Sequence, residues 1–251
     1  GGMPAERIVL HGNNKSREEL ALAAGSGVTV VIDNWRDLEL LAELAPGLEA
    51  SGRAPVRLML RFTPGIECHT HEYIRTGHLD SKFGFDPDQL EGVLQHLVGC
   101  PWGRLTGLHA HIGSQIFELQ PHRDLAGVMA DALALARSLG HPVSDLNVGG
   151  GLGIRYRDEA PPAVAEHLDK VFALLGARPL QLVLEPGRAL VGNAGVLLTR
   201  VEYLKHGSAH NFAIIDAAMN DLMRPALYEA WHDILPVQPR PDGEARDYDV
   251  V

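Results

Sequence analysis

The chain is poor in cysteine, has no long apolar run and carries no excess of positive charge, and each absence excludes a class of protein. Two cysteines, Cys68 and Cys100, are too few for a disulfide framework or a zinc pattern, so we expect a reducing compartment, namely the cytoplasm. No apolar run approaches the ~20 residues needed to span a bilayer. The net charge of −10 argues against a general nucleic-acid surface, which needs clustered lysine and arginine.

What the chain does contain is the composition of a globular protein. It has 251 residues, of which 45% are hydrophobic and 22% are charged. This length is enough to bury the core of one α/β barrel, or of one domain together with part of another.

Short apolar segments alternate with amphipathic ones along most of the chain. The expected strands are 7–11, 28–33, 58–62, 105–112, 146–148 and 182–184. Helices are expected between them. Ser16 and Glu19 form a capping-box pattern, Asn34 is a second cap, and Asp86-Pro87 opens a further helix. Strict alternation of this kind predicts a parallel sheet covered by helices.

The alternation of expected strands and helices stops near residue 193. The segments 196–203 and 212–215 resemble strands without helices between them, which predicts a second, antiparallel β domain. We therefore expect residues 1–193 to form six of the eight strands of a (β/α)8 TIM-type barrel, and residues 194–251 to form part of a β domain. The chain starts without methionine and ends in a strand-like segment, so we expect a fragment that lacks two βα units in front.

The segment Leu182–Arg188 joins an apolar run to an acid, a Pro-Gly turn and a base. A carboxylate at the end of a buried strand is costly without a partner, and a Glu185–Arg188 ion pair would satisfy it. One unit upstream, the glycines of the run 149–151 would let backbone N–H groups approach an anion closely. Loops after the last strands of a barrel are the usual phosphate seat. Together these groups suggest a phosphorylated, positively charged cofactor.

His109 and His111 lie two residues apart on an expected strand, so both side chains should point to one face. Three interpretations stay open. The pair could bind a metal, or it could be two hydrogen-bonded core histidines. Alternatively, the His111 ring could stack on a planar heteroaromatic ring while the Ser114 hydroxyl donates to a phosphate.

Three further segments carry weaker signals. The loop Cys68–Glu72 resembles metal ligands but has no supporting ligands elsewhere, so we interpret it as polar loop. Lys82 is expected to form an ion pair or to anchor the loop at the rim of the barrel, rather than to act as a nucleophile. Arg224, four residues before Tyr228, is a candidate clamp for a carboxylate because its planar fork accepts both oxygens.

Several segments, in this order and spacing, carry a family resemblance: His11–Ser16, Thr76–Gly84, His109–Gln115, Val148–Gly153, Glu185–Arg188 and Met219–Tyr228. They resemble diaminopimelate decarboxylase, a family of the alanine-racemase-like, pyridoxal-phosphate-dependent decarboxylases. The similarity covers nearly the whole chain. Ala218 stands where the family usually has glycine, a departure that we expect to be mild.

The resemblance implies a role for each matching residue. Glu185 would keep the pyridine nitrogen of pyridoxal 5′-phosphate protonated, and His111 would lie against the ring face. The phosphate would be surrounded by Ser114, Gly149, Gly150, Gly151, Pro186, Gly187 and Arg188. The distal amino-acid end of the substrate would be held by Arg188, Arg224 and Tyr228. No metal is implied.

The resemblance also implies an activity, the decarboxylation of meso-2,6-diaminopimelate to L-lysine and CO₂, the last step of lysine biosynthesis. Two of the family's catalytic groups match nothing here. The lysine that binds the cofactor covalently would lie upstream of Gly1, and the cysteine segment given to a neighbouring subunit would follow Val251. Neither Lys15 nor Lys82 matches that lysine. The family is a homodimer with shared active sites, so we expect the same here.

Three alternatives remain. A sister decarboxylase acting on another diamino acid or a carboxy-polyamine would share most of the motifs. A metal-dependent barrel hydrolase would use His109 and His111 as ligands. A non-catalytic binding relative would keep the fold and lose the lysine.

Overall fold

The computed structural model describes residues 2–66, 81–175, 180–239 and 245–251. The loop Cys68–Glu72 and most of the segment Thr76–Gly84 lie outside the described residues. The chain forms two compact units, which we describe separately. The first comprises Gly1–Gly153 and Pro161–Leu190, and the second comprises Ile154–Ala160 and Val191–Val251.

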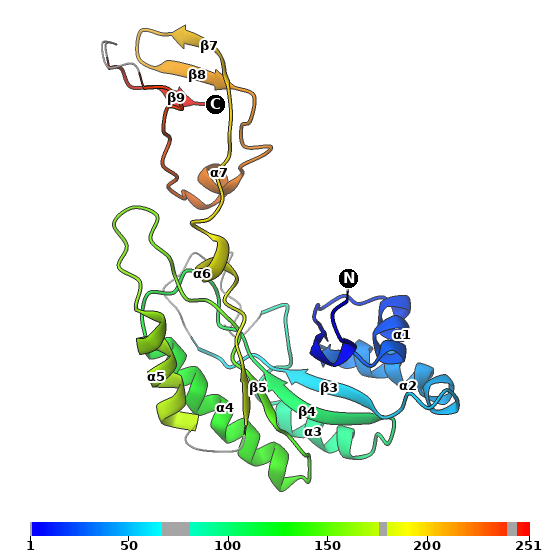
Figure 1. The fold of residues 1–251 in the computed structure, drawn as a ribbon. Coiled ribbons are helices and arrows are strands. Elements are labelled where there is room, and N and C mark those ends of the chain that lie inside the picture. Colours follow the sequence, from blue (N-terminus) through cyan, green and yellow to red (C-terminus); the bar gives the residue numbers. More distant parts are fainter. Residues whose placement is uncertain (1, 67–80, 176–179, 240–244) are drawn as a thin grey trace. The chain divides into compact units, whose positions relative to one another are not determined.

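The first unit is built on one sheet of six parallel strands in consecutive order (Figure 1). The strands are β1 (Val9–Leu10), β2 (Thr29–Ile32), β3 (Val56–Arg61), β4 (Gly103–His109), β5 (Asp145–Asn147) and β6 (Gln181–Val183). Each strand pairs with the next one along the chain, as in a (β/α)8 barrel. The prediction of an α/β fold with six barrel strands is thereby confirmed.

Helices connect the strands and cover the sheet (Figure 1). They are η1 (Ala5–Arg7), α1 (Arg17–Ser26), α2 (Trp35–Ala50), α3 (Leu90–Val98), α4 (Gln120–Ser138), α5 (Val164–Leu175) and the short α6 (Gly187–Val191). Among the described residues, none of the helices combines the length and apolar character that a membrane crossing requires.

Two of the three predicted helix starts are confirmed. Ser16 Oγ accepts from the Glu19 backbone N–H while the Glu19 carboxylate accepts from the Ser16 N–H, which completes the capping box. The Asn34 side chain caps α2 by accepting from a backbone N–H of its first turn. The start at Asp86-Pro87 is wrong, because a hydrogen-bonded turn comes first and α3 begins at Leu90.

The core of the first unit lies between the sheet and its helices. All four residues of β2 are buried, which is typical of a parallel strand covered on both faces. Leu41 of α2, Leu94 of α3 and Leu133 of α4 are each almost fully buried in the same apolar cluster. This packing fixes the strands, and with them the loops that follow their C-terminal ends.

Two buried ion pairs lie near the C-terminal ends of β1, β2 and β3. Lys15 Nζ is 2.8 Å from Asp37 Oδ2, and both side chains are only 2% exposed. Burial raises the pKa of Asp37, and the Lys15 ammonium opposes this. Arg61 lies 3.5 Å from Asp33. Breaking a buried pair leaves an uncompensated charge, so each of these side chains is held in place by its partner.

The second unit contains a three-stranded sheet of β7 (Val201–His206), β8 (Asn211–Ile215) and β9 (Asp249–Val250), and the short helix α7 (Arg224–Tyr228). The antiparallel prediction holds for β7 and β8 only. Strand β9 pairs parallel with β8, so the sheet is mixed.

One buried contact of the first unit predicts a dependence of stability on pH. The rings of His122 on α4 and His167 on α5 meet edge to face with centroids 4.3 Å apart, and both residues are buried. Burial, with smaller contributions from His167 and His111, lowers the pKa of His122 from 6.5 to about 4. The folded His122 is therefore neutral where an unfolded one takes up a proton.

We expect the full-length protein to lose stability as the pH falls from 6.5 towards 4, because the unfolded state binds more protons in that window. The contribution of His122 is fully present above this window and amounts to at most ~3 kcal/mol. His122→Gln should flatten the pH dependence of the free energy of unfolding, whereas His206→Gln, at an exposed position, should not. Equal slopes for wild type and His122→Gln would contradict the assignment.

Candidate cofactor site

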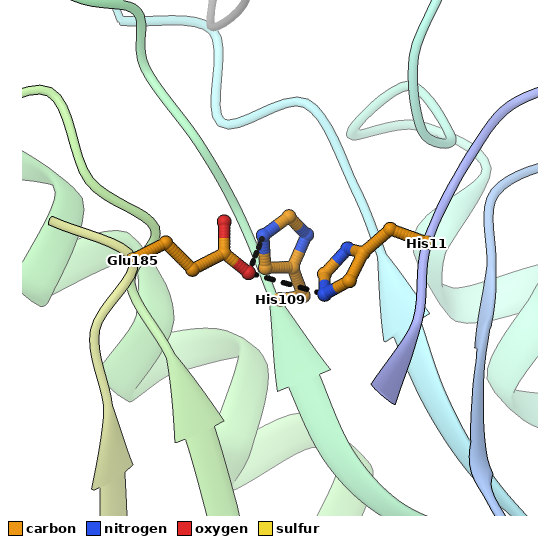
Figure 2. A group of neighbouring side chains, drawn as sticks. All are labelled: His11, His109 and Glu185. Atoms are coloured by element: carbon orange, nitrogen blue, oxygen red, sulfur yellow. Dashed lines mark ion pairs between the residues drawn. The ribbon is translucent and has the colours of Figure 1, made fainter. Parts of the chain in front are cut away.

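Three side chains from distant parts of the sequence meet at the C-terminal ends of the strands (Figure 2). His11 follows β1, His109 is the last residue of β4, and Glu185 follows β6. In Figure 2 the three side chains point towards one another. They meet because the C-terminal ends of parallel strands share one rim of the sheet.

Glu185 has its partners on a single oxygen. Asn147 Nδ2 donates to Oε1 at 2.8 Å, His11 Nε2 lies 3.1 Å from Oε1, and His109 Nε2 lies 3.5 Å from it. Burial by itself would raise the pKa of Glu185, but His109 and His11 outweigh it and hold that pKa far below its usual range. The carboxylate is therefore ionised at neutral pH. The expectation that Glu185 has a partner is confirmed, but that partner is not Arg188.

The two predicted histidines differ in their surroundings. His109 is 1% exposed; its Nδ1 has no hydrogen-bond partner in the described part of the chain, and its Nε2 has only the long 3.5 Å contact with Glu185 Oε1. Burial lowers the pKa of His109, so the ring is neutral. His111 lies beyond the end of β4 rather than on the strand. The Gly150 N–H donates to His111 Nδ1 at 3.2 Å, and burial lowers the pKa of His111 to about 4.

The glycine run is packed directly against these residues. A Cβ atom at Gly149 would lie 2.6 Å from His111 Nδ1, and one at Gly150 would lie 2.0 Å from the carbonyl oxygen of Glu185. At Gly151, with φ +107°, a Cβ atom would lie 2.7 Å from the Gly113 carbonyl oxygen. Only glycine fits at these three positions, so the backbone here forms one surface with His111 and Glu185.

The structure also brings together two of the predicted phosphate residues. Arg188 Nε donates to Ser114 Oγ at 3.1 Å, across 74 positions of sequence. Pro186 and Gly187 make the turn between them and Glu185, and the Gly187 N–H donates to the Glu185 carbonyl at 2.8 Å. A hydroxyl and a guanidinium thus lie on the same rim of the sheet as the glycine run.

This arrangement can hold either a cation or a planar ring with a protonated nitrogen. Ligand atoms of His11, His109 and Glu185 all lie within 4.8 Å of one another, which is compatible with a metal ion. His111 is not a member of that group, so the predicted His109–His111 ligand pair is not the one that the structure assembles. A protonated ring nitrogen would equally satisfy the ionised Glu185.

In the second unit, Arg224 begins α7, and its guanidinium lies 5.3 Å from the ring centroid of Tyr228 and 5.8 Å from that of Tyr156. Its Nε is buried and has no hydrogen-bond partner among the described residues. The guanidinium is thus placed by two aromatic rings and retains donor capacity for a carboxylate.

Two residues of the site were not assigned a role from the sequence. His11 lies in a segment that matches the family, but nothing in the sequence pairs it with Glu185, 174 positions away. Asn147 comes two residues before the glycine run, and its side chain joins that run to Glu185. A polar residue at the end of a buried strand was the only available signal.

The comparisons with known proteins place the chain in a family. Residues 1–192 match the family described as pyridoxal-dependent decarboxylase, pyridoxal binding domain. The chain therefore belongs to the pyridoxal-dependent decarboxylases.

Among its relatives, the chain is 47% identical over 235 residues to diaminopimelate decarboxylase of Synechocystis sp., covering 90% of this chain and 49% of that protein. It is 42% identical over 252 residues to that of Pseudomonas aeruginosa, covering 100% and 59%. The crystal structure of diaminopimelate decarboxylase from Helicobacter pylori complexed with L-lysine superposes with a TM-score of 0.89 at 29% identity, covering 96% and 60%. The chain thus spans about half to three fifths of the length of these relatives.

The close packing of Gly150 yields a sharp prediction. In the full-length protein, Gly150→Ala should displace Glu185, weaken cofactor binding and lower the free energy of unfolding by about 1–3 kcal/mol, as overpacking does. Gly127→Ala on α4 is the matched control, because a Cβ atom there meets nothing within 4 Å. It should be neutral or stabilise by up to about 1 kcal/mol. Wild-type cofactor affinity in Gly150→Ala would refute this packing role.

Proposed function

We propose that the full-length protein decarboxylates meso-2,6-diaminopimelate to L-lysine and CO₂ with pyridoxal 5′-phosphate as cofactor. The proposal is supported by the similarity to diaminopimelate decarboxylases and by one structural observation above all. Glu185 is ionised and held by Asn147, His11 and His109 through a single oxygen. A carboxylate held in this way can keep a pyridine nitrogen protonated.

The residues present fit this cofactor. In the proposal, Glu185 faces the ring nitrogen and the neutral His111 lies against the ring face, its orientation set by the Gly150 N–H. The glycines 149–151 let the backbone pack closely against His111 and the carbonyls of Glu185 and Gly113, and in the proposal this backbone lies beside the phosphate. Ser114 and Arg188, already hydrogen-bonded to each other, supply a hydroxyl and a charge, and the Pro186-Gly187 turn completes the loop.

Loss of CO₂ from an amino acid leaves a carbanion, and the bound cofactor supplies the electron sink that stabilises it. The role of Glu185 is to keep the ring nitrogen of the cofactor protonated. A cationic partner at the same position would leave the ring nitrogen unprotonated and suit racemisation better. The acid therefore favours decarboxylation.

The proposed substrate rests on Arg224. The distal centre of meso-diaminopimelate carries a carboxylate and an amine, whereas lysine and ornithine end in a bare amine. The Arg224 guanidinium would attract the distal carboxylate of diaminopimelate and repel the bare ammonium of lysine or ornithine. This difference would discriminate between the substrates. We assign Arg188, Arg224 and Tyr228 to this end of the substrate.

Two further parts of the proposal concern the whole protein. The family's cofactor-binding lysine matches no residue of this chain, and Lys15 is engaged in a buried ion pair with Asp37. We propose that the full-length protein is a cytoplasmic homodimer with shared active sites, as the family resemblance implies.

The function is tested on the purified full-length protein supplied with pyridoxal 5′-phosphate. We expect visible absorbance from the bound cofactor and release of CO₂ from meso-diaminopimelate, but not from lysine or ornithine. Preference for another diamino acid or a carboxy-polyamine would support a sister decarboxylase. A colourless protein with a stoichiometric divalent metal at His11, His109 and Glu185 would instead support the hydrolase alternative.

Glu185→Gln should lower kcat by about 100-fold or more while changing cofactor affinity far less, because an amide cannot keep the ring nitrogen protonated. The donors around Oε1 should hold the amide oxygen and turn its NH₂ towards the ring. Turnover and equilibrium cofactor binding are measured side by side, with Glu118→Gln at an exposed position as the control. Equal losses of turnover and binding would exclude the electron-sink role.

Arg224→Ala should raise the KM for meso-diaminopimelate by about 10-fold or more, since a charge-assisted bidentate contact is lost. Arg157→Ala is the matched control, because Arg157 also lies over an aromatic ring, 4.4 Å from the centroid of Trp231. Steady-state kinetics on both variants decide the matter. If the two KM values match that of the wild type, Arg224 does not bind the substrate.

A further inference from the structure

We propose that Asn147, His11 and His109 are positioning residues that occupy one carboxylate oxygen of Glu185 and reserve the other, Oε2, for the ring nitrogen of the cofactor. This inference rests on the proposed function, because it specifies how the protein prepares Glu185 for that ring. None of the three residues is assigned to touch the substrate.

The first support is the asymmetry of the contacts. Asn147 Nδ2, His11 Nε2 and His109 Nε2 all approach Oε1, at 2.8, 3.1 and 3.5 Å. No described residue donates to Oε2. A carboxylate oxygen accepts about two hydrogen bonds, so Asn147 and His11 already fill Oε1, His109 adds a longer contact, and Oε2 keeps its capacity.

The second support is the orientation of Asn147, which its own hydrogen bonds determine. The Gly149 N–H donates to Asn147 Oδ1 at 2.9 Å, so the amide oxygen must face the glycine run and the amide nitrogen must face Glu185. Asn147 is 1% exposed, so both ends of its amide depend on these hydrogen bonds within the protein. One side chain therefore ties the phosphate end of the proposed site to its nitrogen end.

The third support is that the shortest contact of the Glu185 carboxylate comes from an uncharged group, the Asn147 amide at 2.8 Å. Arg61, a nearby cation, has its ion pair with Asp33. An amide orients a carboxylate without cancelling its charge, so the charge stays available for the ring nitrogen.

His11 completes the set from the opposite edge of the sheet. Its ring meets the ring of His109 edge to face, with centroids 4.9 Å apart and an interplanar angle of 72°. This contact restrains the imidazole with Nε2 towards Glu185 (Figure 2). A ring without nitrogen could keep the packing and lose the contact with Oε1.

The test uses the full-length protein loaded with ¹⁵N-labelled pyridoxal 5′-phosphate. The variants are Asn147→Leu, His11→Phe, which keeps a ring against His109, and His11→Gln, which restores a side-chain donor. Two quantities are measured, the pH at which the ring nitrogen loses its proton, by ¹⁵N chemical shift, and kcat with KM for meso-diaminopimelate. His122→Gln controls for the loss of a buried histidine elsewhere.

We expect His11→Phe and Asn147→Leu to lower the ring-nitrogen pKa by about one unit and kcat by about 10-fold, with KM changed less than about 2-fold. His11→Gln should recover most of both. A purely structural role would lower the unfolding temperature without moving the titration. If Asn147→Leu does not fold, the two His11 variants decide.

The inference is overturned if His11→Phe and His11→Gln titrate alike, or if folded Asn147→Leu matches the wild type. The proposed function fails separately. A wild type that binds the cofactor but releases no CO₂ from meso-diaminopimelate refutes the substrate, while the ¹⁵N titration still tests the positioning of Glu185.

Discussion

An ionised carboxylate at the rim of a parallel sheet is the feature on which the rest of this site depends. Glu185 is partly removed from water, which alone would favour its neutral form, yet its surroundings hold it charged. A partly buried charge of this kind is unfavourable without a partner. The protein satisfies one oxygen internally, and the proposed cofactor would satisfy the other. Folding thus gives the carboxylate a defined charge and a defined direction.

The architecture explains why the groups converge. Parallel strands in consecutive order bring all six C-terminal ends to one rim, so residues 174 positions apart, His11 and Glu185, come within 3.1 Å. The helical layer and the buried Lys15–Asp37 pair hold this rim in place. The glycine run then packs its backbone directly against His111 and Glu185, where no larger residue would fit. Precision at the site follows from rigid elements rather than from the loops alone.

Much of the fold could be predicted from the sequence, because apolar periodicity and helix caps are local signals. All six strands of the first sheet and the caps at Ser16 and Asn34 were predictable in this way. The start of α3 was not, since a turn that uses Gln89 competes with the cap at Asp86. The parallel pairing of β9 was not predictable either, because register between distant strands leaves no local pattern.

The residue types of the site were predictable from the sequence, but the contacts between those residues were not. Glu185 and the glycine run were predictable from a costly charge and from backbone freedom, whereas the partners of Glu185 were not. The contact with Asn147 depends on which way a buried amide faces, and that follows only from the Gly149 N–H in the folded chain. The contact between His109 and Glu185 likewise forms only in the folded chain and leaves no local pattern in the sequence.

Neutron diffraction from crystals of the full-length protein loaded with pyridoxal 5′-phosphate would test the central claim most directly, because it locates the proton at the cofactor ring. The account predicts a deuteron on the ring nitrogen, with Glu185 Oε2 within about 3 Å of that nitrogen and Oε1 still bound to Asn147. A ring nitrogen without a deuteron, or one that faces a group other than Glu185, would contradict it.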